Sequence, residues 1–179
     1  MTRLAELGFP AMFTVMVHPN ATRIRAFYEA FGRRDAVAMA ALYASDATFS
    51  DPAFPDLSGA AVPGMWASLC EGAEDLRIEL GAVEADDGAG TATWEAWYTF
   101  GAARRPVHNV IRATFTFRDG FVIAHKDRFD FWRWSRQALG LAGWMLGWSG
   151  LFQRQVQRVA RKGLVRWLER PPAGRSEGR

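Results

Sequence analysis

The sequence predicts an α+β domain in which three helices come first and a meander of four strands follows. Segments with helical periodicity lie between residues 20 and 70, and segments that alternate apolar and polar residues lie between 76 and 132. The dipeptides Asp87-Gly88 and Asp119-Gly120 are turn signals between strands. This order is typical of an antiparallel sheet that carries its helices on one face. With 179 residues, 49% of them hydrophobic, the chain can bury one sizeable core.

The first two helices follow each other closely. Apolar residues at helical spacing predict a helix over residues 21–31, with Asn20 as its N-cap. Asp35 is then expected to cap a second helix, which includes Tyr43 and ends near residues 45–46. The apolar faces of both helices are expected to pack on the sheet.

A short strand, a third helix and four longer strands complete the predicted domain. The short strand covers residues 47–51 and ends at Pro52. The spacing of apolar residues predicts the third helix over 62–70. The longer strands are expected at residues 76–85, 91–100, 107–117 and 121–132. A change of phase at Gly81 predicts a bulge in the first of them.

Charge divides the chain into a body and a basic tail. Residues 1–132 carry 12 basic and 17 acidic side chains, whereas residues 133–179 carry 10 basic and 2 acidic ones. Helices are expected at 135–147 and at 151–169, and the second of these is amphipathic and rich in arginine. We expect a loosely ordered leader at 1–19, one domain at 20–132, a helical extension at 133–170 and a disordered end at 171–179.

Several classes of protein are disfavoured by the composition. The single cysteine, Cys70, excludes an internal disulfide framework and argues against a cysteine zinc site, and we expect no metal. The longest apolar run, residues 138–152, is interrupted by four glycines and is too short for a membrane span. The N-terminal residues do not have the features of a secretory signal. We therefore expect a cytoplasmic protein.

The basic tail has three interpretations. Its amphipathic helix can pack on the sheet or on a partner subunit, which is the usual reason for such a pattern. Residues 144–168 can also lie on an anionic membrane surface, because tryptophans accompany the arginines there. Nucleic-acid binding is the least favoured interpretation, because no known motif for it accompanies the charge, and we expect no such partner.

Polar side chains interrupt the apolar face of the last two strands. His125 and Asp127 share this face with Phe129 in the last strand, and Asn109 interrupts it in the strand before. Buried polar groups are costly unless they are paired or used. We therefore predict that these groups converge with Asp51, at the end of the short strand, on an apolar pocket.

Further residues are candidates for the wall of this pocket. Glu95 points into it in one phase of its strand and away from it in the other, and the sequence leaves both phases open. Tyr28, Tyr43, Trp66 and Phe129 are expected to form an aromatic wall. Desolvation raises the pKa of a carboxylate in such a pocket, and histidine titrates near neutral pH. The pocket therefore has the groups that acid–base catalysis needs.

Each polar candidate also has a purely structural interpretation. Asp51 can simply shape the turn that follows its strand. Asp127 can form an ion pair with Arg112 or Arg128, and His125 can be a hydrogen-bonded core residue. The sequence alone does not separate these interpretations from catalysis.

The chain resembles the NTF2-like superfamily, in particular its SnoaL-like, ketosteroid-isomerase-like and limonene-epoxide-hydrolase-like members. The resemblance covers about residues 20–132 and rests on the segments 32–35, 43–52 and 125–130 and on the helix that starts after Gly59. It implies a cone with a strongly curved antiparallel sheet, a deep hydrophobic pocket and frequent homodimers. It also implies catalysis by side chains, without a cofactor.

The functional residues of the superfamily are matched in part. Asp51 lies where ketosteroid isomerases keep their general-base aspartate. Phe27 and Ala113 stand where those enzymes keep the tyrosine and the protonated aspartic acid that stabilise a dienolate, so ordinary ketosteroid isomerisation is not expected. Asp127 lies where limonene-epoxide hydrolases keep an aspartate of a water-activating network, and Glu95 is the nearest candidate for its carboxylate partner.

The predicted pocket and the resemblance lead to two candidate functions. The first is cofactor-free acid–base catalysis on a hydrophobic small molecule, by isomerisation, hydration, epoxide opening or cyclisation. Asp127 and Asp51 would be base and acid, His125 would orient or relay, and Asn109 would polarise the substrate. The alternative is a non-catalytic lipophile carrier or dimeric scaffold that docks through the basic tail. A homodimer is expected for the domain.

Overall fold

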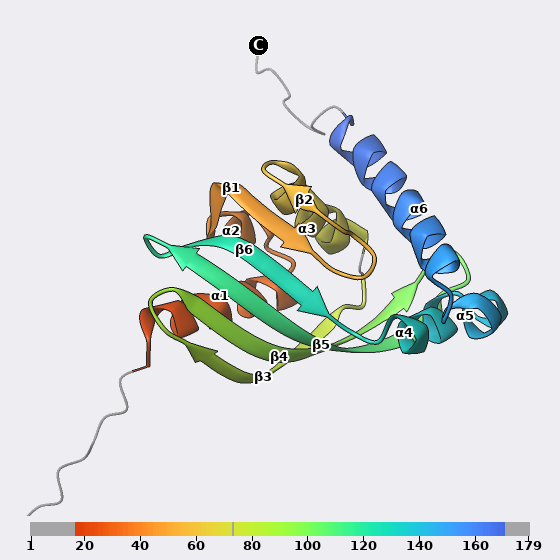
Figure 1. The fold of residues 1–179 in the computed structure, drawn as a ribbon, viewed down its shortest axis with the longest axis horizontal. Helices are drawn as coiled ribbons and strands as arrows, with labels where there is room; N and C mark the ends of the chain where they lie inside the picture. The colour runs from red at the N-terminus through yellow and green to blue at the C-terminus, as the bar shows by residue number, and fades with distance from the viewer. Residues whose placement is uncertain (1–16, 73, 171–179) are drawn as a thin grey trace, which may run out of the picture.

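The computed structural model describes residues 17–72 and 74–170 (Figure 1). In chain order the elements are α1 (Pro19–Gly32), α2 (Ala36–Ala40), β1 (Tyr43–Ser50), β2 (Leu57–Ser58), α3 (Ala61–Gly72), β3 (Arg77–Ala85), β4 (Ala89–Phe100), β5 (Arg105–Arg118), β6 (Phe121–Arg128), α4 (Phe131–Ala138), α5 (Leu141–Leu146) and α6 (Gly150–Leu168). The expected disordered end at 171–179 lies outside the described residues, as does the expected leader apart from residues 17–19.

One curved sheet organises the α+β fold. Its strand order is β2-β1-β6-β5-β4-β3, and β3 to β6 form the predicted antiparallel meander. β1 pairs with β6 in parallel, and the remaining four strand pairs of the sheet are antiparallel. The N-terminal helices lie on its concave side, where α1 packs on β3 and β4 and α3 packs on β1 and β2 (Figure 1). The register shift between Leu80 and Val83 confirms the predicted bulge at Gly81.

An aromatic core fills the space between α1, α3 and the sheet. The Phe27 ring lies edge-on to the rings of Tyr43, Trp66 and His125, with centroids 5.8, 5.2 and 5.6 Å away. Edge-to-face pairs of this kind add to the apolar burial, which stabilises the fold by about 1.5–3 kcal/mol for each large side chain. With Phe115 of β5, the core therefore fixes His125 among aromatic rings from four different elements.

Two of the differences from the predicted element boundaries place polar residues in another element. Tyr43 was expected in a helix, but it begins β1, because it pairs with Val122 of β6. The last strand ends at Arg128 rather than at 132, because the Asp130 side chain accepts a hydrogen bond from the Arg133 amide (2.9 Å) and starts α4. Local capping and strand pairing therefore outweigh the periodic pattern at these two positions.

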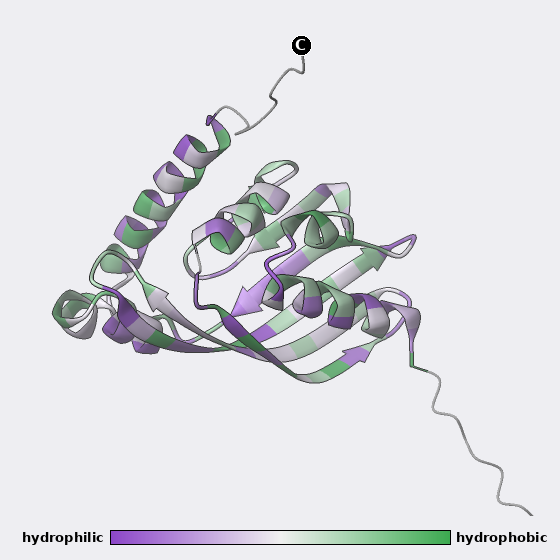
Figure 2. Ribbon diagram, turned by 180° about the vertical axis from the view of Figure 1, so that it is seen from behind, coloured by the Kyte–Doolittle hydropathy of each residue, from purple (hydrophilic) through white to green (hydrophobic). Residues whose placement is uncertain are grey.

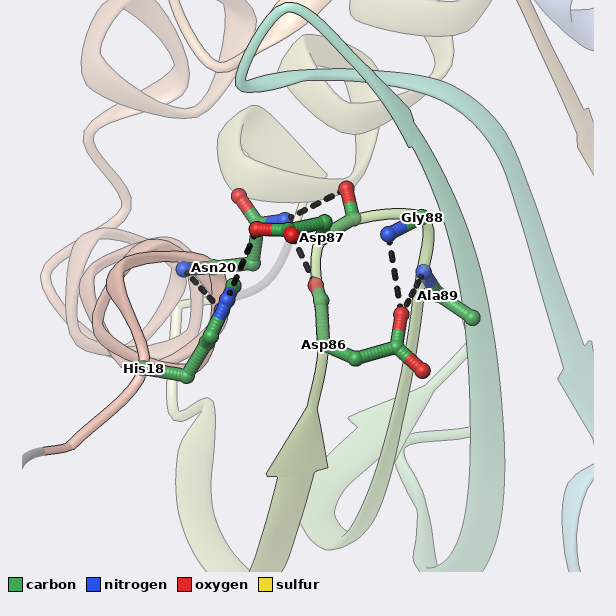
Figure 3. Close-up of polar contacts among 6 residues, drawn as sticks. All are labelled: His18, Asn20, Asp86, Asp87, Gly88 and Ala89. Carbon is green, nitrogen blue, oxygen red and sulfur yellow. Dashed lines mark hydrogen bonds and ion pairs between the residues drawn. The ribbon is translucent and has the colours of Figure 1, made fainter.

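The start of α1 is tied to the turn between β3 and β4 (Figure 3). The predicted N-cap, Asn20, lies within the helix, and His18 is the cap, since its Nδ1 atom accepts from the Asn20 amide (3.2 Å). The Asn20 amide group donates instead to the carbonyl oxygens of Asp86 (2.8 Å) and Asp87 (3.1 Å). Asn20 therefore holds α1 to the turn between β3 and β4 and does not cap the helix.

The C-terminal extension forms three helices at one end of the molecule (Figure 1). The predicted helix at 135–147 is two helices, α4 and α5, and the predicted helix at 151–169 is α6. The side-chain amides of Gln153 and Gln157 both donate to the Pro52 carbonyl, and Leu164 is the buried apolar anchor of α6. These contacts hold α6 against the body. None of the helices in the described part of the chain is long and apolar enough to cross a membrane.

Gly143 allows α5 to pack closely on α4, so Gly143→Ala is expected to destabilise the protein. A Cβ atom at Gly143 would lie 1.9 Å from the Ser135 carbonyl oxygen, which belongs to the backbone and has little freedom to move. We expect the free energy of unfolding to fall by about 1–3 kcal/mol in urea denaturation. The matched control is Gly163→Ala in α6, where an added Cβ meets nothing within 4 Å. Because alanine favours a helix more than glycine, that change should stabilise by about 0.5–1 kcal/mol, and the opposite order would contradict the packing.

Candidate functional site

A cavity of about 610 Å³ lies between the concave face of the sheet and the helices. Its volume is in the range of small-molecule sites. Side chains from β4, β5 and β6 form one wall, α3 forms another, and α4 and α6 contribute Trp134, Val156 and Ala160. Most of the lining is apolar, so the few polar groups on it stand out as candidates for chemistry.

Three of the predicted polar residues line this cavity: Asp51, Asn109 and Asp127. Asn109 points inward because it has the same parity on β5 as the buried residue Ile111. Asp127 is only 4% exposed and lies opposite Ala113 in the β5–β6 register. The structure therefore brings two carboxyl groups and one amide to a single apolar cavity, and their roles in catalysis remain predictions.

A chain of hydrogen bonds runs through the core to Asp127. The Trp66 indole N–H donates to the Tyr43 hydroxyl (3.0 Å), and that hydroxyl lies 2.6 Å from Nδ1 of His125. Nε2 of His125 lies 3.1 Å from Oδ1 of Asp127. Tyr43 and His125 are both buried, and direct side-chain hydrogen bonds therefore connect α3, β1 and β6.

Donor and acceptor counting gives this chain a direction. Trp66 can only donate, so the Tyr43 oxygen accepts from it and the Tyr43 proton is directed to Nδ1 of His125. Burial, and secondarily the charge of Asp127, raise the pKa of Tyr43 well above its usual range, which keeps the hydroxyl protonated. Since Nδ1 of His125 accepts from Tyr43, Nε2 carries the ring proton and donates it to Asp127. The arrangement gives the Trp66 N–H, the Tyr43 hydroxyl and both ring nitrogens of His125 a partner, and holds Asp127 as an acceptor.

Asp51 is the second carboxyl group of the cavity. Its Oδ1 atom accepts from the backbone amides of Ala53 and Phe54, so the residue does shape the turn after β1, as the structural interpretation expected. Nevertheless, burial raises its pKa to about 7, with the Phe54 N–H opposing the shift and Asp127 adding to it. Within the described part of the chain, Oδ2 of Asp51 has no hydrogen bond. Asp51 is therefore poised to exchange a proton near neutral pH.

Tyr98 is a polar residue of the cavity that the sequence did not single out. Its hydroxyl accepts a hydrogen bond from the Trp134 indole N–H (2.9 Å), which leaves its own proton for a guest molecule. Burial raises the pKa of Tyr98 to about 12, so it is a neutral donor. The signal was the alternation of Trp94, Ala96 and Tyr98, which are the inward residues of β4. The sequence left that phase open.

The same phase places Glu95 outside the cavity, which corrects its prediction as a pocket residue. Its carboxylate lies 2.5 Å from Nε2 of His108, on the opposite side of the sheet, where the His108 ring stacks on Trp97. The two neighbouring β4 residues, Trp94 and Ala96, line the cavity instead. Glu95 is therefore not the carboxylate partner of Asp127, and Asp51 is the carboxyl group that shares the cavity with it.

Only some residues of the predicted aromatic wall line the cavity, and the others are buried behind it. Trp66 and Phe129 line the cavity, whereas Tyr28, Tyr43 and His125 lie behind its surface. Tyr43 and His125 act through the hydrogen-bonded chain. Tyr28 packs against the Trp94 ring, and burial raises the pKa of its hydroxyl well above its usual range. Tyr28 is therefore a core residue rather than a contact for a guest.

Phe27 and Ala113, the two residues at the positions of the isomerase oxyanion donors, are both buried in the apolar core. Phe27 packs against the His125 and Tyr43 rings, and Ala113 is buried across from Asp127. Neither can donate a hydrogen bond to an oxyanion. Tyr98 is the donor that this cavity offers instead, from a different strand.

Comparison with known proteins agrees with this architecture. The model of the SnoaL-like domain matches residues 24–125. No match was found among curated proteins. An LEH-like epoxide hydrolase of M. tuberculosis superposes with a TM-score of 0.58 at 18% identity, covering 72% of this chain and 96% of that one.

Two other solved structures have the same fold. A protein of Catenulispora acidiphila with a ketosteroid isomerase-like fold gives a TM-score of 0.60 at 17% identity, with 68% and 95% of the two chains covered. SalBIII, an epoxide hydrolase/cyclase-like enzyme in pyran ring formation, gives 0.55 at 16% identity, with 62% and 89% covered. At these identities the likeness concerns the fold, while the family match spans more than half of the sequence. The chain belongs to the SnoaL-like family of the NTF2-like fold.

Proposed function

We propose that this protein is a cofactor-free acid–base catalyst for a lipophilic small molecule that binds in the cavity. The observation that carries the proposal is the pairing of two unlike carboxyl groups in one apolar space. Asp127 accepts a hydrogen bond from Nε2 of His125, whereas burial raises the pKa of Asp51 to about 7. Carboxyl groups whose environments differ in this way are suited to serve as base and acid at the same pH.

The roles follow from these environments. Asp127 takes the proton from the attacking group, which is a water molecule or a hydroxyl of the substrate. Asp51 in its protonated form gives a proton to the leaving oxygen, and Tyr98 donates a hydrogen bond to the same developing charge. Asn109 orients the substrate through its amide. One proton enters Asp127 and one leaves Asp51, so exchange with solvent restores the starting state.

Ring opening or ring closure at an epoxide fits these roles best. The reaction needs a base for the nucleophile and an acid for the epoxide oxygen, and it needs no electron carrier. Two structural neighbours are an epoxide hydrolase and an epoxide hydrolase/cyclase-like enzyme, which supports this choice of reaction type. The apolar lining favours a substrate with a hydrocarbon skeleton, such as a terpenoid or a polyketide.

The test has two stages. Native mass spectrometry of the purified protein is expected to reveal a retained lipophilic ligand, and a panel of terpenoid and polyketide epoxides is then assayed in ¹⁸O-labelled water. Hydrolysis adds one labelled oxygen to the product, whereas cyclisation leaves the mass unchanged. If ligands bind in the cavity but wild-type protein converts none of the panel, the result favours a lipophile carrier over the proposed catalyst.

A further inference from the structure

An exposed apolar surface covers α5 and its junctions with α4 and α6. It consists of Trp132, Leu141, Trp144, Met145, Leu146, Trp148 and Leu151, and we call it the tryptophan surface. Trp148 is 71% exposed and Leu151 is 73% exposed. Within α5 itself only Gly143 is buried. Large apolar side chains gathered in this way on a soluble domain mark a site of interaction.

The helices that carry the tryptophan surface, and the rest of α6, are rich in positive charge. Between Phe131 and Leu168 the chain has no acidic residue and seven exposed basic ones: Arg133, Arg136, Arg154, Arg158, Arg161, Lys162 and Arg166. Across residues 17–72 and 74–170, no salt bridge involves any of these seven. Hydrophobic and hydrophilic bands alternate along α6 (Figure 2). This end of the molecule therefore combines exposed indoles with cationic groups that form no salt bridge within the described residues.

The side chains of the tryptophan surface belong to neither of the two apolar cores, and other residues hold α6 to the body. α6 is anchored by the buried side chain of Leu164, by Gln153 and Gln157 on the Pro52 carbonyl, and by Trp167 on Glu71. All of these contacts lie on the inner side of the helix, toward the body. The outward residues are left free to meet a partner.

The indoles of the tryptophan surface are held in place by the backbone. Trp132 donates its N–H to the Trp144 carbonyl (3.2 Å), and Trp148 donates to the Met145 carbonyl (2.9 Å). The Arg136 guanidinium lies 4.6 Å from the centroid of the Trp132 ring. A rigid apolar surface of this kind loses little conformational entropy when it meets a partner.

We propose that the tryptophan surface and the exposed basic side chains of α6 bind an anionic lipid bilayer. Indole rings and aliphatic side chains enter the headgroup region, while arginine and lysine meet the negative charge of the lipids. A second copy of the chain is a poorer partner, because self-association would bring two sets of unpaired positive charge together. Nucleic acid would satisfy the charge, but it would leave Leu141, Met145, Leu146 and Leu151 in water.

The test uses the full chain and vesicles that differ only in charge. Co-sedimentation is measured with phosphatidylcholine alone and with about 30 mol% phosphatidylglycerol added. The wild type is expected to bind only the anionic vesicles, and added salt should weaken binding. Trp144→Ser/Trp148→Ser and Arg158→Glu/Lys162→Glu are each expected to weaken binding at least about tenfold.

Matched controls place the same changes elsewhere on the surface. Val37→Ser/Phe121→Ser removes two exposed apolar side chains that are distant from α5 in the sequence. Arg25→Glu/Arg33→Glu makes the same change in net charge on α1 and its C-cap. Both controls should bind like the wild type. Brominated acyl chains should quench the fluorescence of the wild type much more than that of the Trp144→Ser/Trp148→Ser variant, which keeps Trp132.

Three results would overturn the proposal. The first is no binding to anionic vesicles. The second is equal loss in the control variants, which would mean that only overall charge or stability matters. The third is a dimer in analytical ultracentrifugation that Trp144→Ser/Trp148→Ser dissociates, with no vesicle binding by the wild type, since a second copy would then cover the surface. None of these outcomes depends on the chemistry in the cavity.

Discussion

Asp127→Asn is expected to lower kcat/KM by about 10²- to 10⁴-fold for any substrate that the wild type converts. The amide has nearly the shape of the carboxylate, and its oxygen can still accept the proton of His125 Nε2, which lies 3.1 Å away. The buried hydrogen-bonded chain should therefore persist. The amide cannot accept a proton from water or from a hydroxyl group, so the variant loses the base without losing the cavity.

Steady-state kinetics and ligand binding together separate this loss from unfolding. Asp127→Asn should retain the lipophilic ligand in native mass spectrometry, and its KM should change little compared with kcat. The control is Asp87→Asn, the same chemical change at an exposed carboxylate near His18, remote from the residues that line the cavity. Turnover by Asp127→Asn at the wild-type rate would remove Asp127 from the reaction and leave Asp51 as the remaining carboxyl group among the described residues that line the cavity.

The parity of the last two strands was readable in the sequence because one face is consistently apolar. Asn109 and Asp127 interrupt an otherwise apolar alternation, and the structure places both on the cavity wall. The phase of β4 was not readable in this way. Trp94 and Trp97 lie on opposite faces of that strand, so neither phase is clearly the apolar one, and Tyr98 was consequently overlooked. β4 carries aromatic residues on both faces, because Trp97 stacks on His108 on the face that points away from the cavity.

The contribution of the C-terminal helices could not be read from local patterns either. The amphipathic pattern of α6 predicted packing, but the site of packing depends on contacts about a hundred residues apart in the chain, such as those of Gln153 and Gln157 with the Pro52 carbonyl. Pro52 directly follows Asp51. α4 and α6, which flank the tryptophan surface of α5, also contribute Trp134, Val156 and Ala160 to the wall of the cavity that holds the catalytic candidates.

Asp51→Asn is expected to stabilise the protein at pH 8 and to leave its stability at pH 4 nearly unchanged. Burial raises the pKa of Asp51 from 3.8 to about 7 in the folded protein. Between these two values the native state holds more protons than the unfolded state, so the free energy of unfolding falls as pH rises, and the full loss is present above pH 7. The variant cannot ionise and avoids that loss, which is about 2–4 kcal/mol for a shift of this size. Its Oδ1 atom can still accept from the Ala53 and Phe54 amides.

Asp86→Asn is the control that isolates the environment of the carboxyl group. Like Asp51, Asp86 accepts two backbone N–H groups in a turn, from Gly88 and Ala89, but it lies in solvent, and these hydrogen bonds lower its pKa. The two substitutions should therefore change the pH dependence of urea denaturation in opposite directions. If Asp51→Asn followed Asp86→Asn in losing stability above pH 5, the turn would dominate at both sites, and Asp51 would be an ionised structural residue rather than the acid of the cavity. If it gains stability while turnover falls, the protein keeps a destabilising carboxyl group for its function.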